Sequence, residues 1–581
     1  MTTKLLKLAL VGMLLAATLA ACAPAPATAE PTEAMTEAPT EVMTEAPTEV
    51  VTEAATEAPA FEGTTLEADC STDGSGSEIN KVEATDANTV VFTLCRPDPA
   101  FREKVAFTSF EIESPTFIQE GDILNGAVGT GPYKLDAWNK GESVNFVRND
   151  DYWGEAAKTE TLVFRWSTEA AARLLELQAG TVDGIDNVGP EDFETVKADP
   201  DLQLLEREAL NVFYIGFTVD DTNQDQPFAK QEVRQAIAKG IDRQRIVDNF
   251  YPAGSEVADF FTPCAIANGC VGDKWYDFDA AAAKQELADA GYPNGFKTKI
   301  YYRDVVRGYL PNVNQVAQDI QAQLKTNLNI DATLQVVESG EFIGTVSAGG
   351  YTDGLHLLGW GADYPQITNF LDYHFSRNQP QFGTPHPEIY EALEKGAQIA
   401  DPADAEADYT EANNAIKEIV PLIPVAHGGS GVAYRADVEN AQASPLGNEN
   451  FSVMTPGDRT QFVWMQGAEP ISLYCGDESD GESLRACEQV MEPLLTYEVG
   501  GTAVVPALAE SCDPNDDLTV WTCKLRTGVK FHDGTDFDAN AVVFNYSVLI
   551  DASNPLHKGN TGEFNYAATL FGLMNVPPST N

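Results

Sequence analysis

The sequence predicts a mixed α/β protein with at least two lobes. A chain of 581 residues exceeds the size at which a single hydrophobic core stops growing. Along this chain, segments with the period of a helix are interspersed with segments with the period of a strand. Hydrophobic residues make up 43% of the chain, which is enough to fill more than one core.

The helical segments carry apolar residues on one face and capping residues at their ends. Residues 227–250 predict a helix or a pair of helices. Residues 279–291 predict another helix, because Asp279 is placed as an N-cap and Gly291 follows the last turn. Residues 313–327 predict a third helix, whose apolar face consists of Val313, Val316, Ala317, Ile320 and Leu324.

The strand segments are short runs rich in β-branched and aromatic residues. In residues 329–337 the apolar side chains recur at every second position, as in a strand that is buried on one face. Further runs of this kind are residues 88–94, 142–148 and 211–219. Together with the helices they predict a mixed α/β architecture.

The first 22 residues are typical of a targeting segment. Lys4 and Lys7 precede a short apolar run that is too short to span a membrane as a helix. The run ends in Leu-Ala-Ala-Cys, which resembles the bacterial lipobox and implies cleavage before Cys22 and diacylation of its sulfur. The alternative is an ordinary signal peptide in which the cysteine is incidental.

Residues 23–62 repeat Thr, Glu, Ala and Pro, a composition that cannot bury enough apolar surface to fold. We expect a disordered tether that holds a folded body away from a membrane. The formal net charge of the whole chain is −53, which argues against nucleic acid as a partner. An acidic body favours solubility first and cationic ligands second.

Eight further cysteines lie close together in pairs along the sequence. An exported protein meets an oxidising compartment, so we expect four local disulfides. Metal binding is the alternative, but no CxxC pair or nearby histidine supports it. The cysteines are Cys70 and Cys95, Cys264 and Cys270, Cys475 and Cys487, and Cys512 and Cys523.

Several motifs together resemble the extracytoplasmic solute-binding proteins of family 5, which include the oligopeptide- and dipeptide-binding proteins of ABC importers. Their number and spacing carry the resemblance, which covers nearly everything after residue 70. The motifs include "LRTGVKFHDGTDFDANAVVF", "VEATDANTVVFTLCRPDPAF", "GTGPYKL", "RNDDYWG", "LLELQAGTVDGID", "AKQELADAGYPNGF" and "GWGADYP".

The order of these motifs differs from that of the family. The segment like residues 462–581 normally comes first, followed by the segment like residues 79–461. Because no segment is duplicated, the chain resembles a circular permutant, with the former ends joined near residue 460. Such a change is physically permissible where chain termini lie close together at the surface. A misassembled reading frame, or fusion to part of a tandem neighbour, is the alternative.

The resemblance implies an α/β, bi-lobed, periplasmic-binding-protein-like fold of type II, cluster C, with an additional subdomain on the first lobe. Two lobes would close over a ligand, joined by crossings near residues 211–219 and 421–427. The expected organisation is a signal peptide at 1–22, a tether at 23–62, the peripheral subdomain of the first lobe at 63–125 and 501–581, the first lobe at 126–218 and 433–500, and the second lobe at 219–432.

Asp363 is the sharpest candidate for ligand contact. In peptide-binding members, the Asp of this kind of segment pairs with the α-ammonium group of the ligand, and a buried ammonium needs such an acceptor. By the same resemblance, Gly359 and Gly361 would lend backbone groups to the peptide main chain, and Trp360 would help to wall the pocket. The alternative role for Asp363 is to cap a turn.

The segment also departs from the family pattern. The basic residue that some oligopeptide binders place just before the Gly-Trp is replaced by Leu357. Arg303 and Arg307 are possible substitutes for binding a ligand carboxylate, although two arginines in such a stretch are more often solvated. The resemblance therefore leaves the partner of that carboxylate open.

No residues of the sequence predict catalysis, a cofactor or a resident metal. There is no GxSxG motif, "GTGPYKL" lacks the residues of a phosphate loop, and the six histidines are scattered. His356 and His374 flank the segment of Asp363, so a metal complex stays a minor alternative. A secreted hydrolase would need a nucleophile or a metal constellation that the sequence does not show. A purely structural surface protein would lack the "GWGAD" segment.

We therefore expect a monomeric, lipid-anchored, extracytoplasmic solute-binding component of an ABC importer rather than an enzyme. It would capture a peptide-like solute by closure of two lobes and present it to a membrane permease. An oligosaccharide or a nickel complex is the alternative ligand on the same scaffold.

Overall fold

The computed structural model describes residues 61–71, 77–220, 223 and 225–576. The predicted leader and tether, including Cys22, lie outside this part of the chain. The described residues belong to one compact unit. None of their helices combines the length and the apolar character that a membrane crossing needs.

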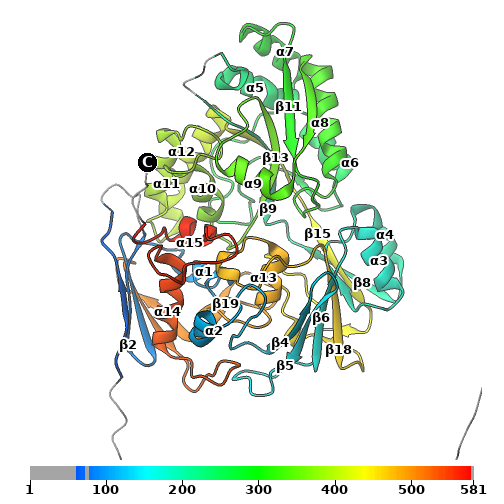
Figure 1. Ribbon diagram of the computed structural model, residues 1–581. Coiled ribbons are helices and arrows are strands. Elements are labelled where there is room, and N and C mark those ends of the chain that lie inside the picture. Colours follow the sequence, from blue (N-terminus) through cyan, green and yellow to red (C-terminus); the bar gives the residue numbers. More distant parts are fainter. Residues whose placement is uncertain (1–60, 72–76, 221–222, 224, 577–581) are drawn as a thin grey trace, which may run out of the picture. The chain divides into compact units, whose positions relative to one another are not determined.

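A seven-stranded sheet forms the centre of the first lobe (Figure 1). Its strand order is β4-β5-β6-β18-β7-β15-β8, so strands distant in sequence lie side by side. In the middle of the sheet β18 runs parallel to β6, with Gln461 opposite Thr161. The strands are β4 (Tyr133–Asn139), β5 (Ser143–Arg148), β6 (Thr161–Trp166), β7 (Gly184–Ile185), β8 (Leu202–Arg207), β15 (Ser430–Arg435) and β18 (Gln461–Gln466), and the lobe also holds the helices α3 (Ala170–Gln178), α4 (Phe193–Ala198) and α13 (Gly481–Cys487).

A six-stranded sheet forms the centre of the second lobe, in the order β10-β14-β9-β13-β11-β12. The helix predicted at 313–327 is α8 (Val313–Leu328), and it packs on β11 and β12. Asp279 caps α7 (Ala280–Asp289) as predicted, since its side chain accepts hydrogen bonds from two backbone amides. The other elements are β9 (Asn211–Phe217), β10 (Glu256–Val257), β11 (Lys297–Tyr302), β12 (Asp331–Val336), β13 (Gly354–Gly361), β14 (Leu422–His427), α5 (Gln231–Gly240), α6 (Arg243–Phe250), α9 (Ser339–Ser347), α10 (Ile367–Phe375), α11 (Pro387–Gly396) and α12 (Pro402–Ile419).

The backbone passes between these two sheets twice. It leaves β8 and enters β9 at residues 208–210, and it leaves β14 and enters β15 at residues 428–429. The strand at 211–217 therefore belongs to the second sheet, directly after the first of these passages. A strand pattern in the sequence does not say which neighbour the strand will pair with.

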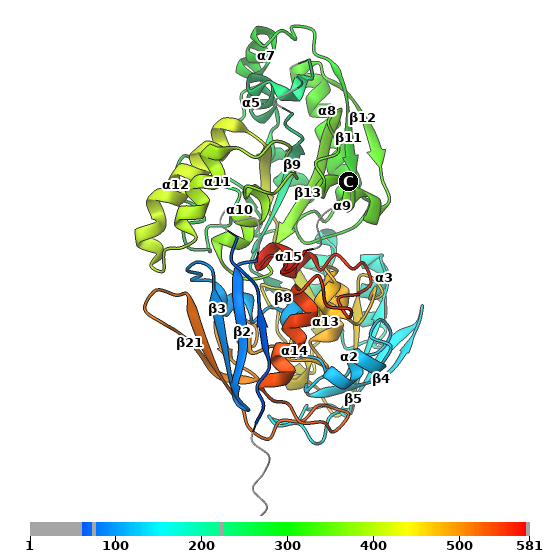
Figure 2. The ribbon, with the colours of Figure 1, turned by 60° about the vertical axis from the view of Figure 1, so that its left-hand side comes forward.

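A five-stranded sheet forms the peripheral part of the first lobe, in the order β1-β2-β3-β22-β21. It combines both ends of the described chain, because β3 pairs with β22. The helix α14 packs on β2 and β3 (Figure 2). The elements are β1 (Thr65–Glu67), β2 (Ile79–Asp86), β3 (Thr89–Leu94), β21 (Ala509–Pro514), β22 (Val520–Leu525), α1 (Phe101–Lys104), α2 (Pro115–Glu120), α14 (Ala539–Ile550) and α15 (Asn565–Leu570).

The C-terminal end of the described chain lies beside the start of β2. The carbonyl oxygen of Phe571 accepts hydrogen bonds from the amide of Glu78 at 2.5 Å and from the hydroxyl of Ser77 at 3.2 Å. The ammonium group of Lys104 donates to the carbonyl oxygen of Leu570 at 3.0 Å. These contacts join the two ends of the described chain within one subdomain.

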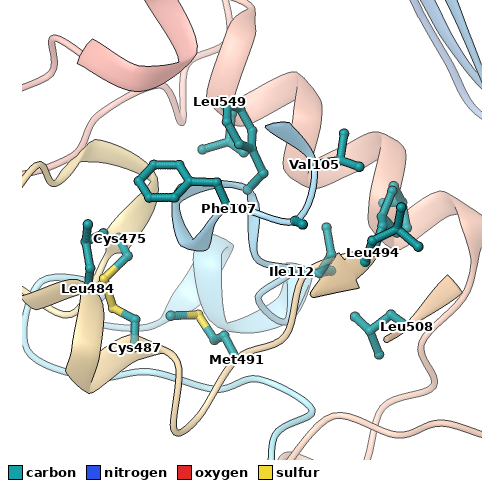
Figure 3. Close-up of a cluster of buried hydrophobic side chains, with 14 of the residues drawn as sticks. Val105, Phe107, Ile112, Cys475, Leu484, Cys487, Met491, Leu494, Leu508 and Leu549 are labelled. Carbon is teal, nitrogen blue, oxygen red and sulfur yellow. A yellow bond between two sulfur atoms is a disulfide. The ribbon is translucent and has the colours of Figure 1, made fainter. Parts of the chain in front are cut away.

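Four disulfides join the cysteines that are neighbours in the sequence. Cys512 and Cys523 face each other across β21 and β22, where the sequence predicts a turn between two strands. The disulfide between Cys475 and Cys487 lies in the core of the first lobe, among side chains from three distant segments (Figure 3). The other two bonds are Cys70–Cys95 and Cys264–Cys270.

Each lobe has its own large cluster of buried hydrophobic side chains, and Tyr364 crosses from one lobe to the other. Tyr364 follows β13 of the second lobe, yet it packs in the cluster of the first lobe and is 1% exposed. Its hydroxyl contacts the hydroxyl of Thr368 at 3.1 Å. Nearby, the Gln366 amide donates to the carboxylate of Glu103 at 3.3 Å. The lobes are therefore in direct contact next to the candidate segment.

Candidate ligand site between the lobes

Asp363 lies two residues beyond the end of β13, and its carboxylate is held from both lobes. The amide of Asn369, on α10, donates to one oxygen at 2.9 Å. The hydroxyl of Tyr566, on α15, donates to the other at 2.8 Å. Figure 1 shows α15 beside α10. Asn369 also accepts from the Asp363 amide at 3.0 Å and from the Trp360 indole at 3.1 Å, so one side chain orients the whole segment.

Burial raises the pKa of Asp363 to about 7, although both hydrogen bonds act to lower it. The cause is the loss of water around the charged form. A cation next to this carboxylate would stabilise its ionised form. The cation would in turn gain a carboxylate partner that is poorly hydrated. The side chain of Asp363 therefore has one partner in its own segment, Asn369, and one in the other lobe, Tyr566.

The two glycines around Trp360 have different surroundings. A Cβ on Gly359 would lie 2.3 Å from the ring of Tyr309, so only glycine allows that ring to cover the strand. Gly361 has open space at the same position. The rings of Trp360 and Tyr373 are tilted by 32° with their centres 4.0 Å apart, and Trp360 contacts the clusters of both lobes.

One edge of β13 is free beyond its midpoint. Residues 355–361 pair with β9 along the other edge. The pairing with β11 ends at His356, so within the described chain the far half of β13 has a strand neighbour on one side only. A free strand edge can accept an extended peptide as an added strand.

A second group of charges meets from the two lobes at Arg307. This residue lies between β11 and α8 in the second lobe, and its guanidinium faces Asp480 at 3.7 Å and Glu482 at 3.6 Å, both at the start of α13 in the first lobe. The charge of Glu482 raises the pKa of Arg307. The pKa of Asp480 is raised to about 7, mainly by burial and secondly by the charge of Glu482.

The hydroxyl of Tyr566 is influenced by carboxylates of both groups, Asp363 and Asp480. Burial raises the pKa of its hydroxyl well above the usual value, and the charges of Asp363 and Asp480 add to this effect. Carboxylates from both lobes therefore act on a single hydroxyl. The sequence does not predict that Tyr566, Asn369, Asp480 and Glu482 belong to this site, because no local pattern sets them apart.

The other residues that the sequence offers as candidates for binding a ligand or a metal contact neighbouring side chains of the protein. Arg303 donates to the hydroxyls of Ser339 at 3.0 Å and Tyr309 at 3.2 Å, so of the two arginines Arg307 is the one that faces the first lobe. His356 and His374 are fully buried among aromatic rings, which lowers the pKa of each to about 3. Among the described residues, no group of three or more His, Cys, Asp or Glu is arranged to hold a metal.

The sequence matches the model of the bacterial extracellular solute-binding proteins, family 5, over residues 49–382 and 503–568, which is more than half of the chain. The chain belongs to this family. Di/tripeptide-binding protein 1 of Pseudomonas aeruginosa is 29% identical over 404 residues, which cover 66% of this chain and 72% of that protein. Another relative is heme-binding protein A of Haemophilus influenzae, 28% identical over 64% of this chain and 69% of its own length.

Solved structures of similar fold include those of two peptide-binding proteins. DppA of Helicobacter pylori in complex with the peptide STSA has a TM-score of 0.57 and 24% identity, covering 72% of this chain and 75% of that one. The murein tripeptide binding protein MppA of Escherichia coli has a TM-score of 0.54 and 23% identity, covering 63% and 71%. This family 5 chain therefore has the bi-lobed fold that its motifs imply, with mixed α/β sheets.

Proposed function

We propose that this family 5 protein captures peptide-like solutes between its lobes and presents them to the permease of an ABC importer. One observation carries the proposal. Asp363 of the second lobe is bonded to Tyr566 of the first, and this position of its carboxylate at the contact between the lobes supports a role in binding a ligand ammonium group. The names of several relatives, which bind dipeptides or tripeptides, support the same ligand class.

The remaining groups fit the other parts of a peptide. The free edge of β13 would pair with its main chain, and Gly361 leaves room for that approach. The guanidinium of Arg307 would bind its carboxylate, since two donors in a planar group suit a carboxylate. Contacts to both lobes then stabilise the closed arrangement over an open one. Binding and release need no covalent step, so we infer a binding protein and no catalytic activity.

Two features of the proposal concern the cellular setting. We infer that Cys22 carries the lipid that anchors the protein outside the cytoplasmic membrane, and that residues 23–62 tether the body to it. We also infer a monomer, because two lobes of one chain supply both halves of the site. The statements on the anchor and the tether rest on the sequence, since Cys22 and nearly all of the tether lie outside the described part.

We further infer that the chain order is a circular permutation. The contacts of Phe571 with Ser77 and Glu78 support it, since they join segments that follow each other in the family order. The matched share of the relatives supports it as well. A permuted chain cannot align with a relative over its whole length in a single collinear pass, and here about two thirds of each is covered.

The test is to purify the protein, denature it and identify the small molecules that it releases by mass spectrometry. We expect peptides from the wild type and none from Asp363→Ala. Asp513→Ala is a matched control, because Asp513 is exposed on β21, away from the site. Release of a sugar or a metal complex from the wild type would overturn the peptide proposal and leave the family unchanged.

A further inference from the structure

We propose that two side chains of the first lobe compete with the ligand for its binding groups, and so set the affinity of the site. In the ligand-free chain the hydroxyl of Tyr566 bonds to Asp363, and the carboxylate of Glu482 faces Arg307. Asp363 and Arg307 are the groups that would receive the charged ends of a peptide, so the inference rests on the function proposed above. We call these two pairs the internal contacts.

The first internal contact completes the hydrogen bonding of Asp363 without a ligand. Tyr566 donates to one carboxylate oxygen at 2.8 Å, and Asn369 donates to the other at 2.9 Å. The ring of Tyr566 packs edge-on against Phe107, with ring centres 4.7 Å apart, and the residue is only 7% exposed. The first lobe therefore fixes the position of this hydroxyl. A ligand ammonium that reaches Asp363 from the side of the first lobe has to take its place.

The second internal contact neutralises the guanidinium of Arg307. In the part of the chain that the structure describes, Glu482 at 3.6 Å and Asp480 at 3.7 Å are its ion-pair partners. Asp480 also caps α13, where it accepts from the amide of Ser483 at 3.0 Å, and its pKa is raised to about 7. Glu482 is therefore the main anion at Arg307, and its carboxylate stands where that of a peptide would bind.

Glu482 keeps a cation nearby when a ligand takes Arg307. The guanidinium of Arg173 donates to four backbone carbonyl oxygens, and among the described residues it has no carboxylate within ion-pair distance. Its pKa is nevertheless influenced by the charge of Glu482. The exchange of Glu482 for a peptide carboxylate at Arg307 therefore does not leave Glu482 without a compensating charge.

Other contacts between the lobes leave the ligand groups untouched. Gln366 donates to Glu103 at 3.3 Å, and the ring of Tyr364 packs in the cluster of the first lobe. Neither side chain bonds to Asp363 or Arg307, so both contacts are compatible with a bound peptide. The internal contacts belong to the ligand-free closed arrangement alone, whereas these two belong to the closed arrangement with or without ligand.

The internal contacts lower the affinity for peptide. A ligand enters between the lobes when they are open, and its apparent affinity falls with the fraction of molecules that are open. Each internal contact reduces this fraction, because it stabilises the closed arrangement without ligand. Removal of an internal contact should therefore tighten binding, whereas removal of a residue that holds the ligand would weaken it.

Calorimetry and stopped-flow fluorescence of the full chain with the neutral peptides Ala-Leu and Ala-Leu-Ala test the proposal. The measurements are made at about pH 8, where Asp363 is ionised. Tyr566→Phe keeps the ring and loses the hydroxyl, and the loss of one hydrogen bond predicts binding about threefold to tenfold tighter. The gain should appear as faster association with unchanged dissociation, because the hydroxyl acts before the peptide is bound.

Three further variants separate competition from other effects. The double variant Asp480→Asn, Glu482→Gln removes the second internal contact while Asn still caps α13, and it should also bind more tightly. Tyr390→Phe, whose ring lies beside Arg377, is the matched control and should bind as the wild type. Gln366→Ala removes a contact that both closed arrangements share, so it should not tighten binding.

X-ray scattering without peptide gives a second readout, in which Tyr566→Phe should have a larger radius of gyration than the wild type. Weaker binding of Tyr566→Phe through faster dissociation would overturn the competition, and so would an unchanged affinity with an unchanged radius of gyration. If this variant does not melt cooperatively, the double variant decides the question by the same two measurements. A wild type that binds neither peptide and releases none on denaturation would overturn the proposed function itself, and the ligand-free scattering would still show whether Tyr566 holds the lobes together.

Discussion

The hydroxyl of Tyr566 donates a hydrogen bond of 2.8 Å to the carboxylate of Asp363, although the two residues are 203 positions apart. Tyr566 comes from the peripheral part of the first lobe and Asp363 from the second. The bond therefore exists only while the lobes are together. The hydroxyl of Tyr566 thus orients the carboxylate of Asp363, and a ligand ammonium group can replace this hydrogen bond or add to it.

The first prediction concerns the pH dependence of peptide binding. A ligand ammonium needs the ionised form of Asp363, whose pKa is about 7. We expect affinity to rise with pH up to about 7, by up to tenfold per pH unit below it, and then to level off. Tyr566→Phe removes a hydrogen bond that lowers this pKa, so its profile should shift to higher pH.

Calorimetry of a neutral dipeptide from about pH 5 to about pH 8 measures both profiles. Tyr390→Phe, on α11, is the control and should keep the wild-type profile. Asp480 also has a pKa of about 7, so Asp363→Asn is the variant that identifies the group responsible. A wild-type affinity that does not change with pH would contradict the role of Asp363.

The second prediction concerns stability and pH. Burial raises the pKa of Glu488 and of Asp372 to about 7, so the folded state holds protons that the unfolded state has released. This stabilisation is complete below the unfolded pKa of about 4 and is lost as pH rises through 7. We expect these two carboxyls to lower the free energy of unfolding between about pH 5 and about pH 8.

Chemical denaturation across this range measures the fall. Glu488→Gln cannot ionise, so its loss should be smaller by roughly 3 kcal/mol, while Glu510→Gln, which is exposed, should behave as the wild type. His356 and His374 act on the acidic side: their pKa values of about 3 mean that stability is lost as pH falls from about 6.5 toward 3. If the stability of Glu488→Gln changed with pH as that of the wild type does, the Glu488 carboxyl would be solvated.

The third prediction concerns the contact between the lobes. Tyr364→Ala removes a ring that is buried in the other lobe, so we expect a loss of about 3–5 kcal/mol and a larger radius of gyration in the absence of peptide. Tyr364→Phe keeps the ring and should cost about 1 kcal/mol. Tyr351→Ala is the matched control, since Tyr351 is buried within the second lobe alone.

Unfolding in denaturant and small-angle X-ray scattering measure the two effects. The control should lose stability without any change in the separation of the lobes. If Tyr364→Ala has the wild-type radius of gyration, the packing of this ring does not hold the lobes together.

The fourth prediction concerns the order of the chain. A rearranged gene would encode residues 460–576 first, then a short Gly/Ser linker, and then residues 77–459. Because Phe571 already bonds to Ser77, we expect this chain, which lacks Cys70, to fold with the three disulfides whose cysteines it keeps. It should melt within a few degrees of residues 77–576 in the original order, which lack Cys70 as well.

Thermal melting and thiol counting measure the result. A second rearrangement that opens the chain inside β9, between Tyr214 and Ile215, is the control and should not fold, because β9 lies in the middle of the second sheet. Failure of the first rearrangement to fold would show that the present order alone supports this structure.

The sequence by itself determined the local elements and the family. The period of residues 313–327 and the cap at Asp279 predicted α8 and α7, because a helix is specified by side chains three and four positions apart and by its own ends. The cysteine pairs are bonded as neighbours for a similar reason, since each pair is close in the chain. The motifs identified the solute-binding fold.

Only the tertiary structure decided how the candidate site is completed. Nothing near Asp363 in the sequence points to Tyr566, and nothing near Arg307 points to Asp480 or Glu482, because these contacts join segments of different lobes. A lobe interface depends on where whole sheets pack, which the periodicity of any one segment does not encode. The charges that meet a ligand are therefore a property of the folded chain.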